Sequence, residues 1–555
     1  EPTRAWIFRF EIASVVIGLV TVVVALARRA WAQAGYVLVQ LLALTTATWF
    51  MSVNRGDLLW FPLFIGIGRL VAHRPDSKGA DLLRSVVLLL VVLADLVLMA
   101  WWARLFFLGH WASWGRLPVV AGRRVWLDRA ECTRREEPVM SGWSDDTIWW
   151  AVYPLGFLGA STRPADGRRP LEHRLPALEG WLDYLLSIGC NGLALGPIFE
   201  SVSHGYDTLD HFRVDPRLGD EDDLAHLVAA CHERGIRVAL DGVFNHVSAA
   251  HPALLAALSG GPGSPTADMF HIDWSTNPPT RLNFEGSDDL VRLNHDSPAV
   301  RELVTRVMNH WLEFGVDAWR LDAAYAVPPS FWAPVLAEVR ASHPRAFVWG
   351  EVIHGDYARI VADSTMDSLT EYELWKAIWS SLAAENFYEL DWTLARHNGF
   401  VEDFVPMTFL GNHDTTRIAS RVGDAKAVLA AVVLLTVGGI PSIYYGDEQG
   451  FRGVKYDRPW GDDEVRPAMP AGPGELSGLG AGMLRRHQQL ISIRRRNPWL
   501  VRARTTVTQL ANDHLVYEAY DPADAARRLY VSLSVGARAK AHVADAAGEL
   551  FAFEG

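Results

Sequence analysis

The chain has 555 residues, which is too long for one ordinary hydrophobic core, so two or three domains are expected. Residues 1–130 carry 14 Lys and Arg against 7 Asp and Glu, whereas residues 131–555 carry 38 against 57. The large part is acidic and lacks a basic stripe. It therefore argues against nucleic acid as a partner, because phosphate neutralisation needs clustered Lys and Arg. Three cysteines form neither a metal-binding spacing nor an even-numbered disulfide framework.

The first part of the chain is strongly apolar. Nearly charge-free runs cover residues 12–27, 34–53 and 82–103, with a shorter run at 58–68. About 20 apolar residues span a bilayer, and flanking arginines favour membrane helices over buried core helices. We therefore expect a membrane region of three or four apolar helices at 1–130, which contacts the lipid bilayer through residues 1–110. The protein would be membrane-associated, with a lean toward a cytoplasmic catalytic part.

From about Asp145 the pattern changes to short apolar strands that alternate with amphipathic helices. This alternation is typical of a parallel sheet in an α/β fold. The expected strands are 147–154, 191–199, 237–244, 317–324, 346–352, 368–373, 405–411 and 440–446. Eight such strands predict a closed (β/α)8 barrel, a TIM barrel, over residues 131–497.

Capping residues and glycines predict where the helices begin and end. Residues 220–235 begin with acidic side chains and end at a glycine, as a capped helix does. Residues 297–315 have Ser297 as the expected N-cap and a proline in the first turn. A third helix is expected at 482–497.

Two further parts flank these units. The gap between the third and fourth strands exceeds one strand–helix unit by roughly 50 residues and is rich in Gly, Pro, Ser and Asn. It predicts a short inserted subdomain at 247–294. After the last helix, the runs 514–520 and 528–535 alternate apolar and polar residues. They predict a small antiparallel, all-β domain at 498–555.

Arg320 and Asp322 lie two residues apart at the end of the fourth strand, so both side chains point the same way. In a barrel, the carboxyl ends of the strands form the catalytic mouth. An adjacent guanidinium favours the ionised carboxylate and lowers its pKa, which suits a nucleophile. A simple buried ion pair explains this stretch alone equally well.

Other strand ends favour catalysis. Polar side chains also follow the third, fifth and seventh strands, namely Asp241, Asn245, His246, Glu351, His413 and Asp414. Four polar clusters at one rim are improbable as accidents of packing. One acid that can stay protonated, one ionised carboxylate and further groups for sugar hydroxyls are the equipment of a glycosidase.

Four motifs carry a family resemblance. They are "DGVFNH", "GVDAWRLD", "VWGE" and "FLGNHD", and in this order they resemble the signature regions of the α-amylase family, glycoside hydrolase family 13. The resemblance covers about residues 145–555. It implies that Asp322 is the nucleophile, that Glu351 is the general acid/base and that Asp414 binds sugar hydroxyls and stabilises the transition state.

The same resemblance implies further roles. Arg320, His246 and His413 would bind the sugar at the cleavage site, whereas Asp241 and Asn245 would be structural there. Residues 203–219 resemble the family's loop after strand two. In that loop Tyr206 would stack on the sugar and Asp207 would hold hydroxyls, although a plain hairpin turn is the alternative. A covalent glycosyl-enzyme and retention of configuration follow, with the two carboxyl groups about 5–5.5 Å apart.

Departures from the family pattern limit what carries over. Typical α-amylases follow the nucleophile with a Lys-His pair that grips the reducing-side sugar, but here Ala-Ala-Tyr follows Asp322. The sequence therefore does not decide between endo- and exo-action, and endo-action on long starch chains is not predicted. Asn245 matches a calcium ligand of many relatives, yet one ligand does not make a site. No cofactor is expected to be required, and calcium is possible but not predicted.

The sequence thus predicts a retaining hydrolase of α-glucosidic bonds in α-glucans or malto-oligosaccharides. A transglycosylase of the glucanotransferase or isomerase type, with the same residues, is the alternative. A non-catalytic, amylase-like transporter subunit fits less well, because such subunits have lost the catalytic residues. Residues 1–130 loosely resemble the membrane end of family-2 glycosyltransferases. Because the chain begins at Glu1, we expect it to be part of a longer protein.

Overall fold

The structure is a computed structural model that describes residues 22–23, 26–27, 142–163, 168–536 and 538–555. The chain divides into two compact units, Glu1–Glu131 and Cys132–Gly555. The description below concerns the second unit. The predicted domain boundaries stay predictions.

Among the described residues, no helix combines the length and the apolar character needed to cross a membrane. The runs predicted to span the bilayer lie, apart from four residues, outside the described residues. The predicted membrane attachment therefore finds no support in the structure. Hydropathy alone did not decide the question, because a helix that is apolar all round can also be a buried core helix.

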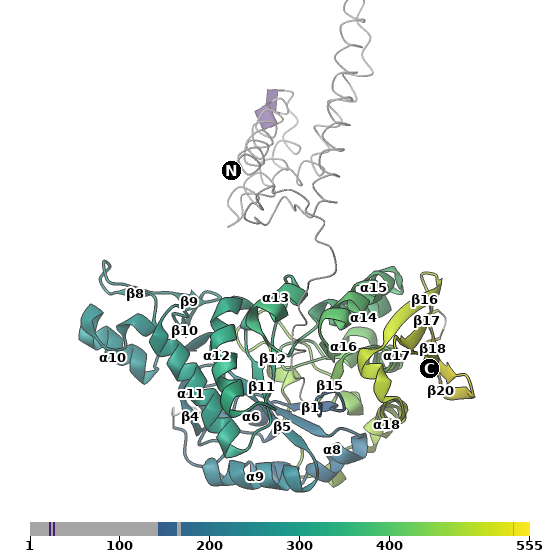
Figure 1. The fold of residues 1–555 in the computed structure, drawn as a ribbon, viewed down its shortest axis with the longest axis horizontal. Coiled ribbons are helices and arrows are strands. Elements are labelled where there is room, and N and C mark those ends of the chain that lie inside the picture. Colours follow the sequence, from purple (N-terminus) through teal and green to yellow (C-terminus); the bar gives the residue numbers. More distant parts are fainter. Residues whose placement is uncertain (1–21, 24–25, 28–141, 164–167, 537) are drawn as a thin grey trace, which may run out of the picture. The chain divides into compact units, whose positions relative to one another are not determined.

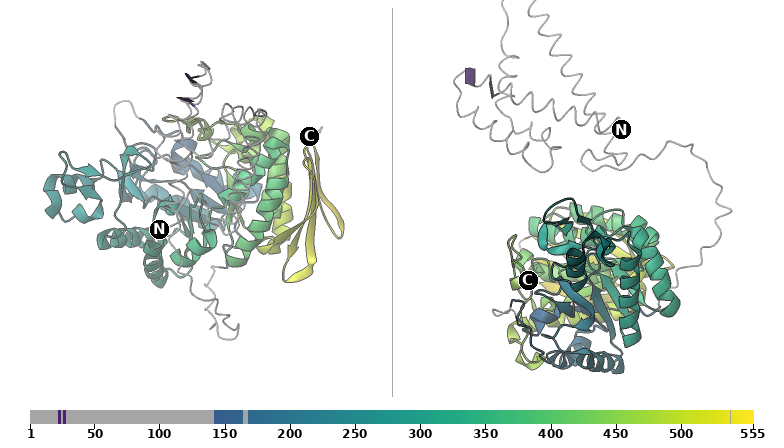
Figure 2. Two further views of the ribbon diagram at one scale, coloured as in Figure 1. Left: turned by 90° about the horizontal axis from the view of Figure 1, so that it is seen from above. Right: turned by 90° about the vertical axis from the view of Figure 1, so that its left-hand side faces the viewer.

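Eight parallel strands form the barrel (Figures 1 and 2). They are β1 Trp149–Val152, β2 Gly192–Leu195, β5 Arg237–Gly242, β11 Ala318–Leu321, β12 Phe347–Gly350, β13 Ser368–Leu369, β14 Met407–Phe409 and β15 Ile440–Tyr444. Their order is β13-β12-β11-β5-β2-β1-β15-β14, and a parallel bridge between Thr370 and Met407 joins the two edges. The predicted barrel is confirmed, with each strand inside its expected range.

Aromatic side chains fill the barrel interior. Trp149, Phe347 and Trp349 are buried there, together with small residues of the neighbouring strands. The rings of Trp149 and Trp349 lie 5.2 Å apart. Inward-pointing side chains of alternate strands pack in layers, so the barrel is a filled core and only its carboxyl-end mouth is open to ligands.

Helices surround the barrel. They are α6 Pro154–Phe157, α7 Pro176–Glu179, α8 Leu182–Ile188, α9 Glu221–Glu233, α11 Pro298–Phe314, α12 Pro329–Ser342, α13 Tyr357–Ser364, α14 Tyr372–Ala384, α15 Tyr388–Asp403, α16 Ile418–Val422, α17 Asp424–Thr436 and α18 Ala481–Arg496. The expected caps form: Asp220 and Asp223 make a capping box on α9, and the Ser297 side chain accepts from the backbone of Ala299 on α11. The three helices predicted from the sequence are confirmed.

The inserted subdomain contains a three-stranded sheet, β6-β10-β9, a two-stranded sheet, β7-β8, and one α-helix. Its elements are β6 His246–Ser248, α10 Pro252–Gly260, β7 Ile272–Asp273, β8 Thr280–Arg281, β9 Asn283–Phe284 and β10 Ser287–Arg292. A separate hairpin, β3 Phe199–Ser201 with β4 Thr208–Val214, follows β2. The β9–β10 turn contains Glu285 and Gly286, whose φ angles of 48° and 76° are left-handed.

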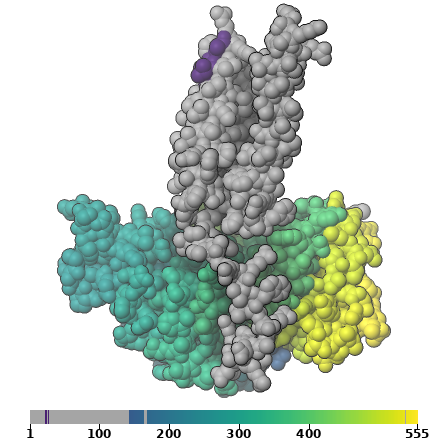
Figure 3. Space-filling model, turned by 45° about the horizontal axis from the view of Figure 1, so that its top comes forward, coloured from purple at the N-terminus to yellow at the C-terminus, as the bar shows by residue number. Residues whose placement is uncertain are grey.

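The chain closes with a five-stranded antiparallel sheet. Its strands are β16 Arg504–Leu510, β17 His514–Asp521, β18 Asp524–Ser534, β19 Lys540–Asp545 and β20 Gly548–Glu554. This sheet and the inserted subdomain lie on opposite sides of the barrel (Figures 1 and 3). The predicted all-β ending is confirmed.

Candidate active site

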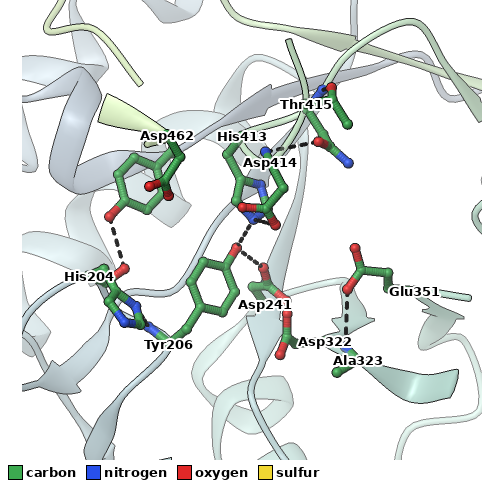
Figure 4. A network of polar contacts seen from close by, with 12 residues as sticks. His204, Tyr206, Asp241, Asp322, Ala323, Glu351, His413, Asp414, Thr415 and Asp462 are labelled. Carbon is green, nitrogen blue, oxygen red and sulfur yellow. Dashed lines mark hydrogen bonds and ion pairs between the residues drawn. The ribbon is translucent and has the colours of Figure 1, made fainter. Parts of the chain in front are cut away.

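A cavity of about 800 Å³ opens at the carboxyl ends of the strands. It is lined by six of the residues predicted from the sequence, namely Tyr206, Asp207, His246, Asp322, Glu351 and Asp414. Arg320, His413 and Asp241 line a smaller adjoining space, which Glu351 also borders. Nine of the ten predicted site residues therefore meet at one mouth, and Figure 4 shows six of them.

Arg320 lies at the centre of the carboxylates. Strand register places it beside Asp241 on β5, and the Arg320 Nη1 atom lies 2.6 and 2.5 Å from the two Asp241 oxygens. The same nitrogen lies 3.3 Å from Asp322 Oδ1, and Nη2 lies 3.0 Å from Glu351 Oε1. One guanidinium thus contacts carboxylates from three successive barrel strands.

The pKa of the Asp322 carboxyl group differs from the prediction. Burial raises the pKa of Asp322 well above its ordinary value, and Arg320 acts in the opposite direction but does not outweigh it. The neighbouring Glu351, Asp241 and Asp414 carboxylates also raise it. The predicted lowering of the Asp322 pKa is therefore wrong, because Arg320 shares its charge with Asp241 and Glu351 and is not Asp322's alone.

Glu351 is held by donors from three directions. Its Oε2 accepts from the backbone N–H of Ala323, at 3.1 Å, and its Oε1 accepts from the Tyr372 hydroxyl, at 2.9 Å, as well as from Arg320. Tyr372 in turn accepts from the Asn412 side chain, at 2.9 Å. Sequence reasoning missed Tyr372, since the sixth strand carries no recognised motif. The one signal in the sequence was the position of Tyr372 at the end of the sixth expected strand, because strand ends form the mouth.

Asp414 faces the open cavity, and its side chain is 37 % exposed. His413 Nε2 lies 3.0 Å from Asp414 Oδ2, Arg466 Nη2 lies 2.7 Å from Oδ1, and Lys455 is 3.8 Å away. Burial opposes ionisation of Asp414, but these three groups outweigh it and lower its pKa well below the ordinary value. Asp414 is therefore a stable carboxylate at the mouth. Arg466 was missed because it lies far along the chain from the motif that it serves.

Tyr206 connects two of the predicted residues. Its hydroxyl donates to Asp241 Oδ2, at 3.0 Å, and lies 2.5 Å from His413 Nε2 (Figure 4). The Tyr206 and His413 rings are nearly parallel, at 12°. Tyr206 thus lines the mouth, and these contacts fix its ring where it can contact a bound sugar.

Two predicted sugar-binding residues have their polar atoms engaged by the protein. Both ring nitrogens of His246 are 3.0 Å from protein atoms, one in the Asn245 side chain and one in the Tyr206 backbone. Both carboxylate oxygens of Asp207 accept from Ser203, at 3.1 and 2.6 Å. Each borders the cavity, but binding a sugar hydroxyl would require sharing or exchanging these bonds.

A second cavity of about 240 Å³ adjoins the mouth. His204, Trp460, Asp462 and Arg466 border both spaces. Arg466 also forms an ion pair with Asp462 and lies over the Tyr153 ring, at 4.7 Å. The mouth therefore continues past the catalytic carboxylates on the side of Asp414.

One buried amide lies where the family resemblance places a calcium ligand. Asn245 is fully buried, and its Oδ1 has no hydrogen-bond partner among the described residues. The described residues contain one group of three His, Cys, Asp or Glu side chains close enough to share a metal ion, and none of its members lines the mouth. His173, Asp220 and Asp223 do lie close together, but the aspartates already cap α9 and bind His173.

The fold and the carboxylate-lined mouth define a barrel enzyme of the glycosidase type. A family model described as alpha amylase, catalytic domain, matches residues 175–475. The chain is 30 % identical over 384 residues to a maltogenic alpha-amylase of Bacillus acidopullulyticus, covering 64 % of each chain. It is 33 % identical over 411 residues to a cyclomaltodextrinase of Geobacillus thermopakistaniensis, covering 68 % of this chain and 67 % of that one.

The chain therefore belongs to the α-amylase family. It matches about two thirds of the length of these relatives. A cyclic α-maltosyl-(1→6)-maltose hydrolase of Arthrobacter globiformis has the same fold, with a TM-score of 0.62 and 24 % identity over 74 % of this chain and 99 % of that one. The prediction of an α-amylase-family enzyme is confirmed, and the relatives that the chain matches are named as enzymes.

Three expectations for the front of the chain did not hold. A relative from Bacillus subtilis, 31 % identical over 348 residues and 56 % of each chain, is named an intracellular maltogenic amylase. The name of this relative contradicts the predicted membrane-associated location. The resemblance to family-2 glycosyltransferases and the lipid bilayer partner are not supported either.

Proposed function

We propose that the protein hydrolyses α-glucosidic bonds of malto-oligosaccharides or related α-glucans, with retention of configuration. The observation that carries the proposal is the position of Arg320, which contacts Asp322 and Glu351 at one mouth while Asp414 faces the same cavity. The names of the relatives, maltogenic amylase and cyclomaltodextrinase, support malto-oligosaccharides and cyclomaltodextrins as the substrates to test.

In the first step, the Asp322 carboxylate attacks the anomeric carbon and Glu351 gives a proton to the glycosidic oxygen. The bond between the anomeric carbon and this oxygen breaks, which leaves a glycosyl ester on Asp322. Arg320 positions both carboxylates. Asp414, kept ionised by His413 and Arg466, binds hydroxyls of the distorted sugar as positive charge develops on the ring.

In the second step, the Glu351 carboxylate takes a proton from water, and the water oxygen attacks the anomeric carbon. The ester bond breaks and Asp322 is released as a carboxylate. Two displacements at the same carbon return the original α configuration. Burial raises the pKa of Asp322, so the reaction requires that this carboxyl group has lost its proton when the substrate binds.

A transglycosylase is the second candidate. It uses the same two steps, but a sugar hydroxyl replaces water in the second. The observation that favours it is the wall of the mouth beside Glu351, where the partly exposed side chains of Tyr325 and Ile353 offer contact area to an acceptor.

The test is a substrate panel of maltose, maltotriose, pullulan, sucrose, starch and β-cyclodextrin, with products separated by chromatography and the first-formed anomer read by NMR. We expect release of α-anomeric sugars from the shorter and cyclic glucans. Asp322→Asn should lower kcat roughly a thousandfold or more. The matched control Asp513→Asn changes an exposed aspartate in the turn between β16 and β17 and should leave kcat unchanged.

Retained turnover in Asp322→Asn, or β-anomeric first products, would contradict the proposal. Longer oligosaccharides formed from maltotriose in excess over glucose would favour the transglycosylase.

A further inference from the structure

The turn after the nucleophile brings an aromatic side chain to the acid/base. Ala323 has a left-handed backbone, with φ 45°, and begins the short helical turn Ala324–Ala326. This geometry brings Tyr325 back toward β12, where its N–H donates to the Glu351 carbonyl at 3.2 Å. The Tyr325 ring lies 5.9 Å from that of His354 and lines the mouth.

The inserted subdomain fixes this aromatic ring. The Tyr325 hydroxyl donates to Glu285 Oε1, at 2.7 Å, from the tip of the β9–β10 hairpin. The hairpin is held at two places: Phe284, beside the tip, stacks on His246 at 4.6 Å and 11°, and Arg292, at the other end of β10, donates to the Ala326 carbonyl at 3.2 Å. The hairpin and the β11 turn therefore form one continuous wall of the mouth.

This wall lies on the leaving-group side. Glu351 protonates the departing oxygen in the proposed reaction and later deprotonates the acceptor, so the sugar beyond the cleaved bond must approach from the side of Glu351. Tyr325 and Ile353 border the cavity beside Glu351, and the Ile353 side chain is 41 % exposed. A tyrosine that lines a cavity with its hydroxyl bonded offers an apolar ring for contact with a ligand.

We propose that Tyr325, oriented by Glu285, is the platform that binds the sugar on the leaving-group and acceptor side of the cleaved bond. The inference rests on the proposed function and names the residue that selects between a sugar and water as acceptor. The segment after Asp322 thereby has a defined role, although it lacks the Lys-His pair of typical α-amylases.

The test compares two substrates that differ in what leaves. Maltotetraose releases a sugar, whereas α-maltosyl fluoride releases fluoride, which needs no platform. Tyr325→Ala should lower kcat/KM for maltotetraose roughly tenfold, with a much smaller loss for the fluoride. Transfer from α-maltosyl fluoride to added glucose, relative to hydrolysis, should fall by a similar factor.

Milder variants and a control separate binding from folding. Tyr325→Phe keeps the ring and should retain most activity with a raised KM, and Glu285→Gln keeps an acceptor oxygen and should resemble the wild type. Tyr388→Ala removes an exposed tyrosine of α15 and should alter neither substrate. Circular dichroism and thermal midpoints verify that each variant is folded.

The outcomes are distinct. Equal losses on both substrates, or no loss on maltotetraose, would overturn the platform while leaving the enzyme assignment standing. A wild-type chain that turns over neither substrate would overturn the proposed function itself. If Tyr325→Ala does not fold, the KM and transfer ratio of Tyr325→Phe decide, and unchanged values would reject the inference.

Discussion

Three hydrogen-bond donors hold Glu351, and they differ in whether a single substitution can remove one without disturbing other contacts. Arg320 also binds Asp241 and Asp322, and the Ala323 N–H belongs to the backbone, so Tyr372 is the donor that a single substitution removes cleanly. Its hydroxyl links Glu351 to Asn412, the residue just before His413 and Asp414. Tyr372 therefore couples the position of the acid/base to the loop that carries the stabilising carboxylate.

Tyr372→Phe should lower kcat roughly tenfold while KM changes little, because the carboxyl group loses a positioning bond and the sugar loses no contact. Steady-state kinetics on the best substrate of the panel measure this. The matched control is Tyr517→Phe, which removes a buried hydroxyl bonded to Thr436 far from the mouth. The control should cost stability of about 1 kcal/mol and leave kcat unchanged. A KM rise without loss of kcat would reassign Tyr372 to substrate binding.

Residue spacing explains which parts of the site could be predicted. Arg320 and Asp322 stand two apart on a strand, and this period alone places them together. Arg466 reaches Asp414 from a loop after the eighth strand, so no local pattern links the two. The engaged nitrogens of His246 and the net pKa of Asp322 depend on neighbours from other strands. Such long-range contacts are invisible to periodicity.

At the scale of elements, strands and caps follow from local chemistry, whereas irregular pieces do not. Alternating units predicted the barrel, and Ser297 predicted the start of α11. The inserted subdomain was recognised only as a loop-like insertion. Its paired strands are short, two to six residues, and its β10–β9 register shifts, so the sequence pattern is too brief to indicate a sheet.

One short element after β15 should govern the pH dependence of stability. The 3-10 turn Asp447–Gln449 buries Glu448, whose carboxyl group accepts from Tyr184 of α8 and from the Gly446 N–H, each at 2.9 Å. Burial raises the pKa of Glu448 from 4.5 to about 7. The folded chain then binds a proton that the unfolded chain has lost. The associated stability is fully present below pH 4.5 and is lost as pH rises to about 7.

Glu448→Gln removes this titration, because its amide can accept from Gly446 and donate to Tyr184 at any pH. Relative to the wild type, the free energy of unfolding of the variant should rise by up to about 3 kcal/mol between pH 4.5 and 8. Urea unfolding at a series of pH values measures the difference. Parallel stability curves for the two proteins would show that Glu448 does not titrate in this range.

At the scale of the whole described unit, the barrel and the C-terminal sheet share one apolar core. Leu515 and Tyr517 of β17 belong to the same buried cluster as Leu429 and Val432 of α17. The Tyr517 hydroxyl lies 2.6 Å from Thr436 Oγ1, at the end of that helix. Since α17 also leads into β15 at the mouth, loss of packing at the sheet should be felt by the catalytic barrel.

Tyr517→Ala should therefore destabilise sheet and barrel together, by roughly 3–5 kcal/mol, as expected for a large buried aromatic side chain. Native-state hydrogen exchange can follow the slowest amides of β17 and β12 separately. If the two regions form one cooperative unit, their opening free energies should be equal in the wild type and fall by the same amount in the variant. A fall confined to β17 would instead mean that the sheet opens alone, and activity measured below the new transition would then stay at the wild-type level.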